Sequence, residues 1–76
     1  MGSKYPLLPP NDIIKVLTRL GFQKNSQKGS HVKYTKQGNP SRTAIIPIHS
    51  EVARGTLKSI LEQADITLDD FLSNLK

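Results

Sequence analysis

The stretch that decides the fold is HVKYTKQGNPSRTAIIPI, residues 31–48. Both of its ends alternate between polar and apolar side chains, which is the pattern of β-strands with one buried face. The Gly-Asn-Pro in its middle predicts a turn. We therefore expect a hairpin with strands at 31–36 and 42–48. Pro47 has no N–H to donate to a neighbouring strand, so the second strand should lie at an edge of the sheet.

The alternation also fixes which residues face each other across the hairpin. Pairing around Gly38 and Asn39 places Val32 opposite Ile46 on the buried face, and Tyr34 opposite Ala44. A shift by one residue would turn the apolar side chains outward. The other face of the hairpin then carries His31, Lys33, Thr35, Thr43, Ile45 and Pro47.

Upstream of the hairpin the sequence predicts a helix. Pro9 and Pro10 can begin a helix but not continue one, and Asn11 or Asp12 supplies a cap or a first-turn acid. Gly21 ends the helix. Its buried face is marked by apolar side chains at helical spacing, namely Ile13, Val16, Leu17 and Leu20. Between helix and hairpin we expect a short polar edge strand at 22–26 and a turn at 27–30.

Downstream of the hairpin two further helices are predicted. The first has an apolar stripe, and the triplet Asp65-Ile66-Thr67 interrupts it. Thr67, with Asp70 three residues later, resembles a capping box and begins the second. The apolar positions are Ala53, Leu57, Ile60, Leu61 and Ala64 in the first helix, and Leu68, Phe71, Leu72 and Leu75 in the second. The expected fold class is α+β, with three antiparallel strands and helices on one face in the order α-β-β-β-α-α.

Length and composition limit the class of protein. A chain of 76 residues forms one small domain, expected at 9–76 after a disordered or extended lead-in at 1–8. Residues 1–3, Met-Gly-Ser, are expected to be a cloning remnant or a loose terminus. The absence of Cys excludes disulfide frameworks, Cys-based zinc sites and cysteine nucleophiles. No signal peptide or stretch of ~18 apolar residues is visible, so we expect no membrane association and a cytoplasmic protein.

Charge is divided unevenly along the chain, whose net charge is +5. Residues 1–42 hold eight Lys and Arg against one Asp, a balance of +7, whereas residues 43–76 hold three against five acids, a balance of −2. A small domain with one strongly basic half points to a polyanion such as RNA or DNA. A solvated basic surface without a ligand is the alternative.

The stretch Lys28-Gly29-Ser30-His31 is the strongest candidate for chemistry. Gly29 lets backbone N–H groups approach a phosphate, Ser30 adds a hydroxyl, and Lys28 and Lys33 add positive charge. The imidazole of His31 suits proton transfer near neutral pH. The alternative interpretation is a plain Gly-Ser turn followed by an exposed strand residue.

Other candidate residues each keep two interpretations. His49 is either a second acid or base beside His31 or a residue that satisfies backbone groups before the next helix. Arg54 and Lys58, four apart on one helix face, either bind phosphate or form the solvated side of that helix. Two histidines and scattered acids predict no metal site, and no motif predicts a cofactor. No aromatic cluster offers a stacking platform for single-stranded RNA.

Four segments in order carry a resemblance to a known family. They are the helix that ends in Leu-Gly-Phe at 20–22, Gln-Lys-Gly-Ser-His at 27–31, Ile-Pro-Ile-His at 46–49, and GTLKSILEQA at 55–64. From Pro9 to Leu75 the chain resembles the HicA toxins, also called YcfA-like proteins, of type II toxin–antitoxin systems. The resemblance implies a fold like the double-stranded-RNA-binding domain, with the family's essential histidine at His31 and its Gly-Ser at Gly29 and Ser30.

The resemblance also implies an activity and a partner. It implies a ribosome-independent endoribonuclease that cleaves mRNA and is held inactive by a HicB-like antitoxin from the same operon. The residues alone leave two other classes open: a basic module that binds RNA without cutting it, and a protein whose only task is to bind a partner. His31 in its Lys-Gly-Ser setting distinguishes them, because pure binding needs basic residues there and not a titratable one.

Overall fold

Three helices and one three-stranded sheet make up the computed structural model, which describes residues 5–75. The predicted remnant at 1–3 lies outside the described residues. In chain order the elements are α1 (Pro10–Arg19), β1 (Gln23–Lys28), β2 (His31–Lys36), β3 (Arg42–Pro47), α2 (Arg54–Ala64) and α3 (Leu68–Ser73). The predicted α+β class and the order of its elements are confirmed.

The sheet has the strand order β1-β2-β3, with both neighbouring pairs antiparallel. The predicted hairpin register is confirmed: Val32 pairs with Ile46, Tyr34 with Ala44, and His31 with Pro47. Val32, Tyr34, Ala44 and Ile46 are all buried, because the alternation places their side chains under the helices. The ladder of β3 ends at Pro47, one residue earlier than predicted.

The first strand differs from the prediction. We expected it at 22–26, followed by a four-residue turn, whereas β1 runs to Lys28 and the turn is only Gly29-Ser30. Phe22 lies in the core, 2% exposed, and precedes the strand. Every residue of β1 is exposed, so the strand has no apolar alternation that could mark its ends. A register shift between Lys24 and Ser26 adds a bulge.

The free edge of β3 is covered by two features. The strand order confirms the edge position that Pro47 predicted for β3, and Pro47 has no N–H to leave unpaired at this edge. The N–H of Ile45 donates to Oε1 of Gln63 on α2, at 3.3 Å. A helix side chain therefore takes the place that a fourth strand would otherwise fill.

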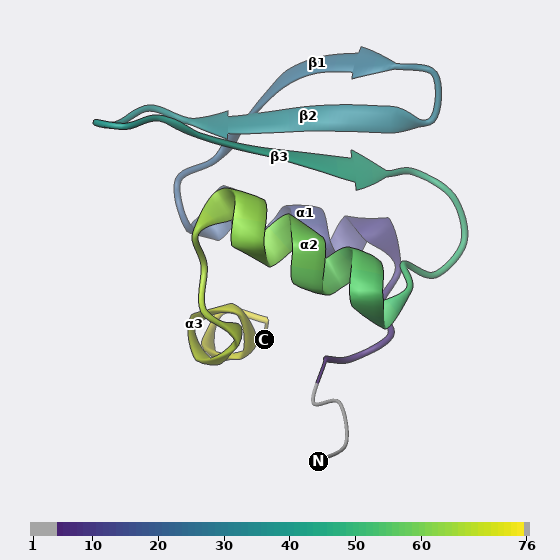
Figure 1. Cartoon of the computed structure of the whole chain (residues 1–76). Helices are drawn as coiled ribbons and strands as arrows, with labels where there is room; N and C mark the ends of the chain where they lie inside the picture. The colour runs from purple at the N-terminus through teal and green to yellow at the C-terminus, as the bar shows by residue number, and fades with distance from the viewer. Residues whose placement is uncertain (1–4, 76) are drawn as a thin grey trace.

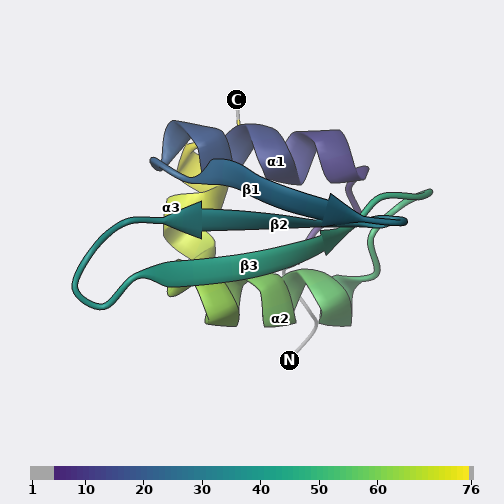
Figure 2. The same cartoon turned by 90° about the horizontal axis from the view of Figure 1, so that it is seen from above.

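The helices all lie on one side of the sheet (Figures 1 and 2). α1 and α2 form a layer against its inner face, with α2 next to β3, and α3 lies under them, farther from the sheet. The guanidinium of Arg19 donates to the carbonyl of Asn74 at 2.6 Å and so ties α1 to the end of α3. The outer face of the sheet is left uncovered by the elements that the structure describes.

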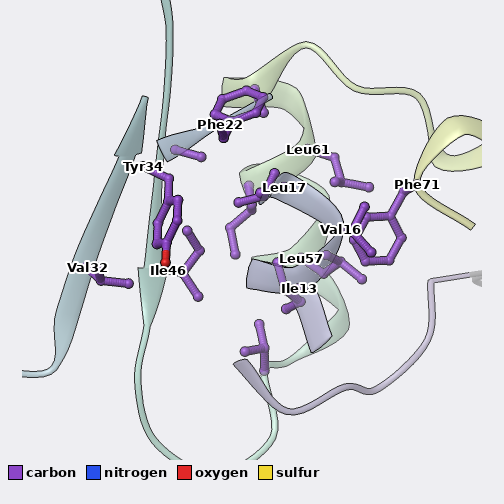
Figure 3. Packing of buried hydrophobic residues seen from close by; sticks show 14 residues of the cluster. Ile13, Val16, Leu17, Phe22, Val32, Tyr34, Ile46, Leu57, Leu61 and Phe71 are labelled. Atoms are coloured by element: carbon purple, nitrogen blue, oxygen red, sulfur yellow. The ribbon is translucent and has the colours of Figure 1, made fainter. Parts of the chain in front are cut away.

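The hydrophobic core fills the space between the sheet and the helices and continues to α3 (Figure 3). Phe71 of α3 points between α1 and α2, toward Val16 and Leu61, and is fully buried. The core comprises Ile13, Val16, Leu17, Phe22, Val32, Tyr34, Ala44, Ile46, Val52, Leu57, Ile60, Leu61, Ala64 and Phe71.

The helix ends follow the predicted signals in part. α1 has Pro9 at its N-cap without a side-chain hydrogen bond, so Asn11 is not the cap, whereas Asp12 is the predicted first-turn acid. In α3 the hydroxyl of Thr67 accepts from the N–H of Asp70 at 3.1 Å, as half of a capping box would. Gly21, at φ +98, adopts a conformation after α1 that favours glycine.

Two residues predicted within the downstream helices lie outside them: Ala53 precedes α2, and Leu75 follows α3. Ala53 is the exposed N-cap of α2, and Val52 before it is buried instead. The N–H of Val52 donates to the carbonyl of Leu8 at 2.8 Å, and this bridge holds Val52 against the core. Leu72 lies in α3 as predicted and is 37% exposed.

Candidate nucleic-acid interface

The outer face of the sheet is basic. Lys28 and Lys33 lie on this face, and none of the three strands contains Asp or Glu. The other strand cations, Lys24, Lys36 and Arg42, lie on the side of Tyr34 and Ala44, where Arg42 forms an ion pair with Asp65 at 2.9 Å. All but two of the acidic side chains of the chain lie in α2 or after it, and the other two are Asp12 and Glu51. The uneven charge seen along the sequence therefore becomes an uneven charge in space, with an acid-free sheet that suits a polyanion.

The strand register brings several of the predicted residues together on this face. Lys28 of β1 pairs with His31 of β2, and Ser26 pairs with Lys33. On the other side of β2, Lys33 pairs with Ile45. These five residues line an open pocket of about 410 Å³.

The Gly29-Ser30 turn joins β1 to β2 beside the pocket. Gly29 has φ +60 and Ser30 has negative φ, as a two-residue turn with glycine first requires. A Cβ at Gly29 would meet nothing within 4 Å, so glycine serves the backbone conformation and not internal packing. Within residues 5–75 the N–H groups of Gly29 and Ser30 donate to no other group of the chain. They are available to an outside acceptor such as a phosphate oxygen.

His31 stands exposed at the centre of this arrangement, between Lys28 on β1 and Pro47 on β3. In the described part of the chain its side chain forms no hydrogen bond or ion pair. Its imidazole is thus accessible to a ligand, as predicted from the alternation. The charged side chains beside it on the same face are the cations Lys28 and Lys33, and no acid lies among the pocket residues.

The region from α1 to the end of α2 matches a family model described as the HicA toxin of bacterial toxin–antitoxin systems, over residues 10–66. The chain belongs to the HicA toxin family. The match covers three quarters of the chain and includes the hairpin, the Gly-Ser turn and His31. A search of curated proteins gives no match. The family match confirms the HicA resemblance that the sequence indicated. HicA toxins are paired with HicB antitoxins.

The second histidine of this HicA-family chain lies outside the pocket. His49 follows the end of β3 at an exposed bend and forms no hydrogen bond with any described residue. The N–H of Ile48 before it donates to the carbonyl of Ser30 at 2.6 Å, which holds the two chain segments together at the same end of the hairpin as His31. In the described residues His49 therefore caps no backbone group.

Arg54 and Lys58 are not brought to the outer face. They lie on α2, in the helix layer on the other side of the sheet, and line no part of the His31 pocket. The Nε of Arg54 donates to the carbonyl of Tyr5 at 2.8 Å and so holds the segment before α1. Lys58 is exposed. Their contact with RNA stays a prediction for a second surface.

Two pocket residues of the HicA fold were not among the predicted site residues. Ile45 was expected on the outer face, and the hairpin register alone could have placed it beside Lys33. Ser26 had no such signal, because the bulge before it changes which side chains of β1 face outward.

Residues 5–75 hold no group of three or more His, Asp or Glu side chains placed to bind a metal ion. Among the helices described, none is long and apolar enough to span a bilayer.

Proposed function

We propose that this HicA-family chain is an endoribonuclease that cleaves mRNA in the cytoplasm, with His31 as a general acid or base. One observation carries the proposal: His31 is exposed between Lys28 and Lys33 on a sheet face without acids, beside two N–H donors of a Gly-Ser turn. A face that only binds phosphate needs the cations and donors. It gains nothing from a side chain that exchanges protons near neutral pH.

RNA supplies the nucleophile for this reaction. The 2′-OH attacks the adjacent phosphorus, its proton leaves to a base, the bond to the 5′-oxygen breaks, and that oxygen takes up a proton. His31 performs one of the two proton transfers. Lys28, Lys33 and the N–H groups of Gly29 and Ser30 stabilise the charge on the phosphate oxygens, and preorganised donors of this kind contribute about 3 kcal/mol each to the transition state. His49 is the candidate for the second proton transfer.

The partner in this proposal is a HicB-like antitoxin encoded by the neighbouring gene. HicA-family toxins pair with HicB antitoxins. Nothing in residues 5–75 covers the outer face of the sheet. An antitoxin seated there would exclude RNA from His31 without any change in the fold of the toxin.

The purified chain is expected to cleave single-stranded RNA in the presence of EDTA. Products should end in a 2′,3′-cyclic phosphate and a 5′-OH, because the 2′-OH of the substrate is the attacking group. A 2′-deoxy nucleotide at the cleaved position should make the RNA resistant. Gel analysis of end-labelled RNA with end-group determination measures both. RNA that is bound but stays intact would instead support a non-catalytic RNA-binding module of this fold.

RNA binding should depend steeply on salt. Each phosphate contact to a single strand contributes about 0.7 to the slope of log affinity against log salt concentration, because binding releases counterions. Lys28→Ala and Lys33→Ala, each made in a His31→Ala background to prevent cleavage, should each lower the slope by roughly that amount. Fluorescence anisotropy over a salt series measures it.

Lys15→Ala is the matched control for this series, since it removes the same charge from an exposed position on α1. It should leave the slope unchanged. Lys58→Ala reports in the same way whether α2 also contacts RNA. Equal changes in the slope for Lys28→Ala, Lys33→Ala and Lys15→Ala would argue against the outer face as the binding surface.

A further inference from the structure

The outer face of the sheet has two chemically different halves. β1 and β2 present Lys28, His31 and Lys33, whereas β3 presents Ile45 and Pro47. Adjacent strands lie about 4.8 Å apart, so the apolar strip runs directly beside the basic row. Lys33 pairs with Ile45, and His31 pairs with Pro47. A ligand that covers both halves must be anionic on one side and apolar on the other.

Ile45 is unusually exposed for a large aliphatic residue in a strand. Its side chain is 43% exposed, whereas Ile46, its neighbour in sequence, is fully buried in the core. Among the described residues only Leu7 and Leu72 are comparably exposed large apolar side chains, and neither belongs to the sheet. Ile45 is also the one apolar residue of the pocket that contains His31. Packing of the core therefore gives no reason for its apolar side chain.

The pocket is large enough for a group the size of one nucleotide. Its volume of about 410 Å³ lies in the range of small-molecule sites. A nucleotide also matches the division of the face, because its phosphate is anionic and the faces of its base are apolar. The absence of acids from all three strands favours the same ligand.

We propose that Ile45 and Pro47 form a nucleobase subsite, which holds an unpaired base next to the phosphate that His31 and the lysines engage. The inference rests on the proposed function and adds to it how the substrate is selected. A base can offer its face to Ile45 only when it is unstacked, as in a single strand or a loop. Cleavage should therefore be confined to unpaired positions, even though the sheet is basic enough to attract duplex RNA.

A coupling experiment tests this subsite through binding alone. The probes are 2′-O-methyl oligonucleotides, which lack the attacking hydroxyl, in a series with one abasic position each. Ile45→Thr keeps a β-branched side chain but removes apolar contact, and it should weaken binding of the intact oligonucleotide about tenfold. One abasic position should cause a similar loss in the unmutated chain and little further loss in Ile45→Thr. Ile45→Tyr should bind at least as tightly as the unmutated chain, because aromatic rings stack on bases.

Leu72→Thr is the control, since Leu72 has a similar exposure on α3, away from the sheet. It should change neither affinity nor the effect of any abasic position. Fully additive losses for Ile45→Thr and every abasic position would overturn the subsite. So would a variant that binds RNA normally but loses its antitoxin, because the strip would then be a protein-docking surface. A chain that cleaves no RNA would refute the proposed function, while the coupling would still report on the subsite.

Discussion

His31→Ala is expected to slow RNA cleavage by about 10²–10⁴-fold, the usual effect of removing a general acid or base. The protein should stay folded. The side chain of His31 is exposed and forms no hydrogen bond with the described residues, and substitutions at such positions shift stability by no more than about 0.5 kcal/mol. Single-turnover cleavage of a labelled RNA and thermal unfolding followed by circular dichroism measure the two quantities.

Two variants show what the loss means. His31→Gln keeps a polar side chain of similar length but cannot exchange protons near neutral pH, so it should be as slow as His31→Ala. His49→Ala tests whether His49 is the second proton carrier. A comparable loss of cleavage rate would assign that role to His49, and an unchanged rate would exclude it. A folded His31→Ala protein that cleaves at the original rate would refute catalysis by His31 and favour the binding module.

Phe71→Ala is expected to cost about 3–5 kcal/mol of unfolding free energy, as for other buried aromatic side chains. Phe71 is fully buried between α1 and α2, and α3 has only six residues to hold it in place. For a domain of this size each kcal/mol lowers the Tm by about 4–8 °C. The variant should therefore unfold far below the unmutated chain in a thermal scan.

The adjacent residue provides the control for this prediction. Leu72→Ala changes an exposed side chain on the same short helix, so its effect should stay near 0.5 kcal/mol. Similar Tm losses for both variants would mean that α3 does not complete the core as described. The HicA family match ends at residue 66, so the test also asks whether a helix beyond the matched region is part of the folding unit.

The sequence predicted the β2–β3 hairpin to within one residue because apolar and polar side chains alternate along both strands and mark the buried face. Val32, Tyr34, Ala44 and Ile46 can face the helices in only one register. β1 is polar throughout, so nothing in its sequence marks its ends or its bulge. Ala53 was placed on the wrong side of the helix start for a related reason, because helical spacing alone does not separate the cap from the first turn.

The candidate site could be predicted where it depends on one hairpin and not where it depends on packing between layers. His31 and Lys33 follow from the alternation of β2, and Lys28 follows from its place next to the turn. Arg54 and Lys58 were correctly expected to be exposed, but the sequence does not say on which side of the sheet α2 lies. The partner of Arg54, a carbonyl forty-nine residues earlier, is likewise beyond any local pattern.

The coverage of the β3 edge makes the two sides of the sheet unequal toward other chains. Gln63 and Pro47 block two positions of the β3 edge, so a strand from another molecule extends the sheet more readily at β1. There it would meet Lys24, Lys28 and a bulge, three features that oppose casual pairing between copies of the same basic chain. The edges of the sheet thus disfavour growth by strand addition, while the outer face that carries His31 stays uncovered by the described residues.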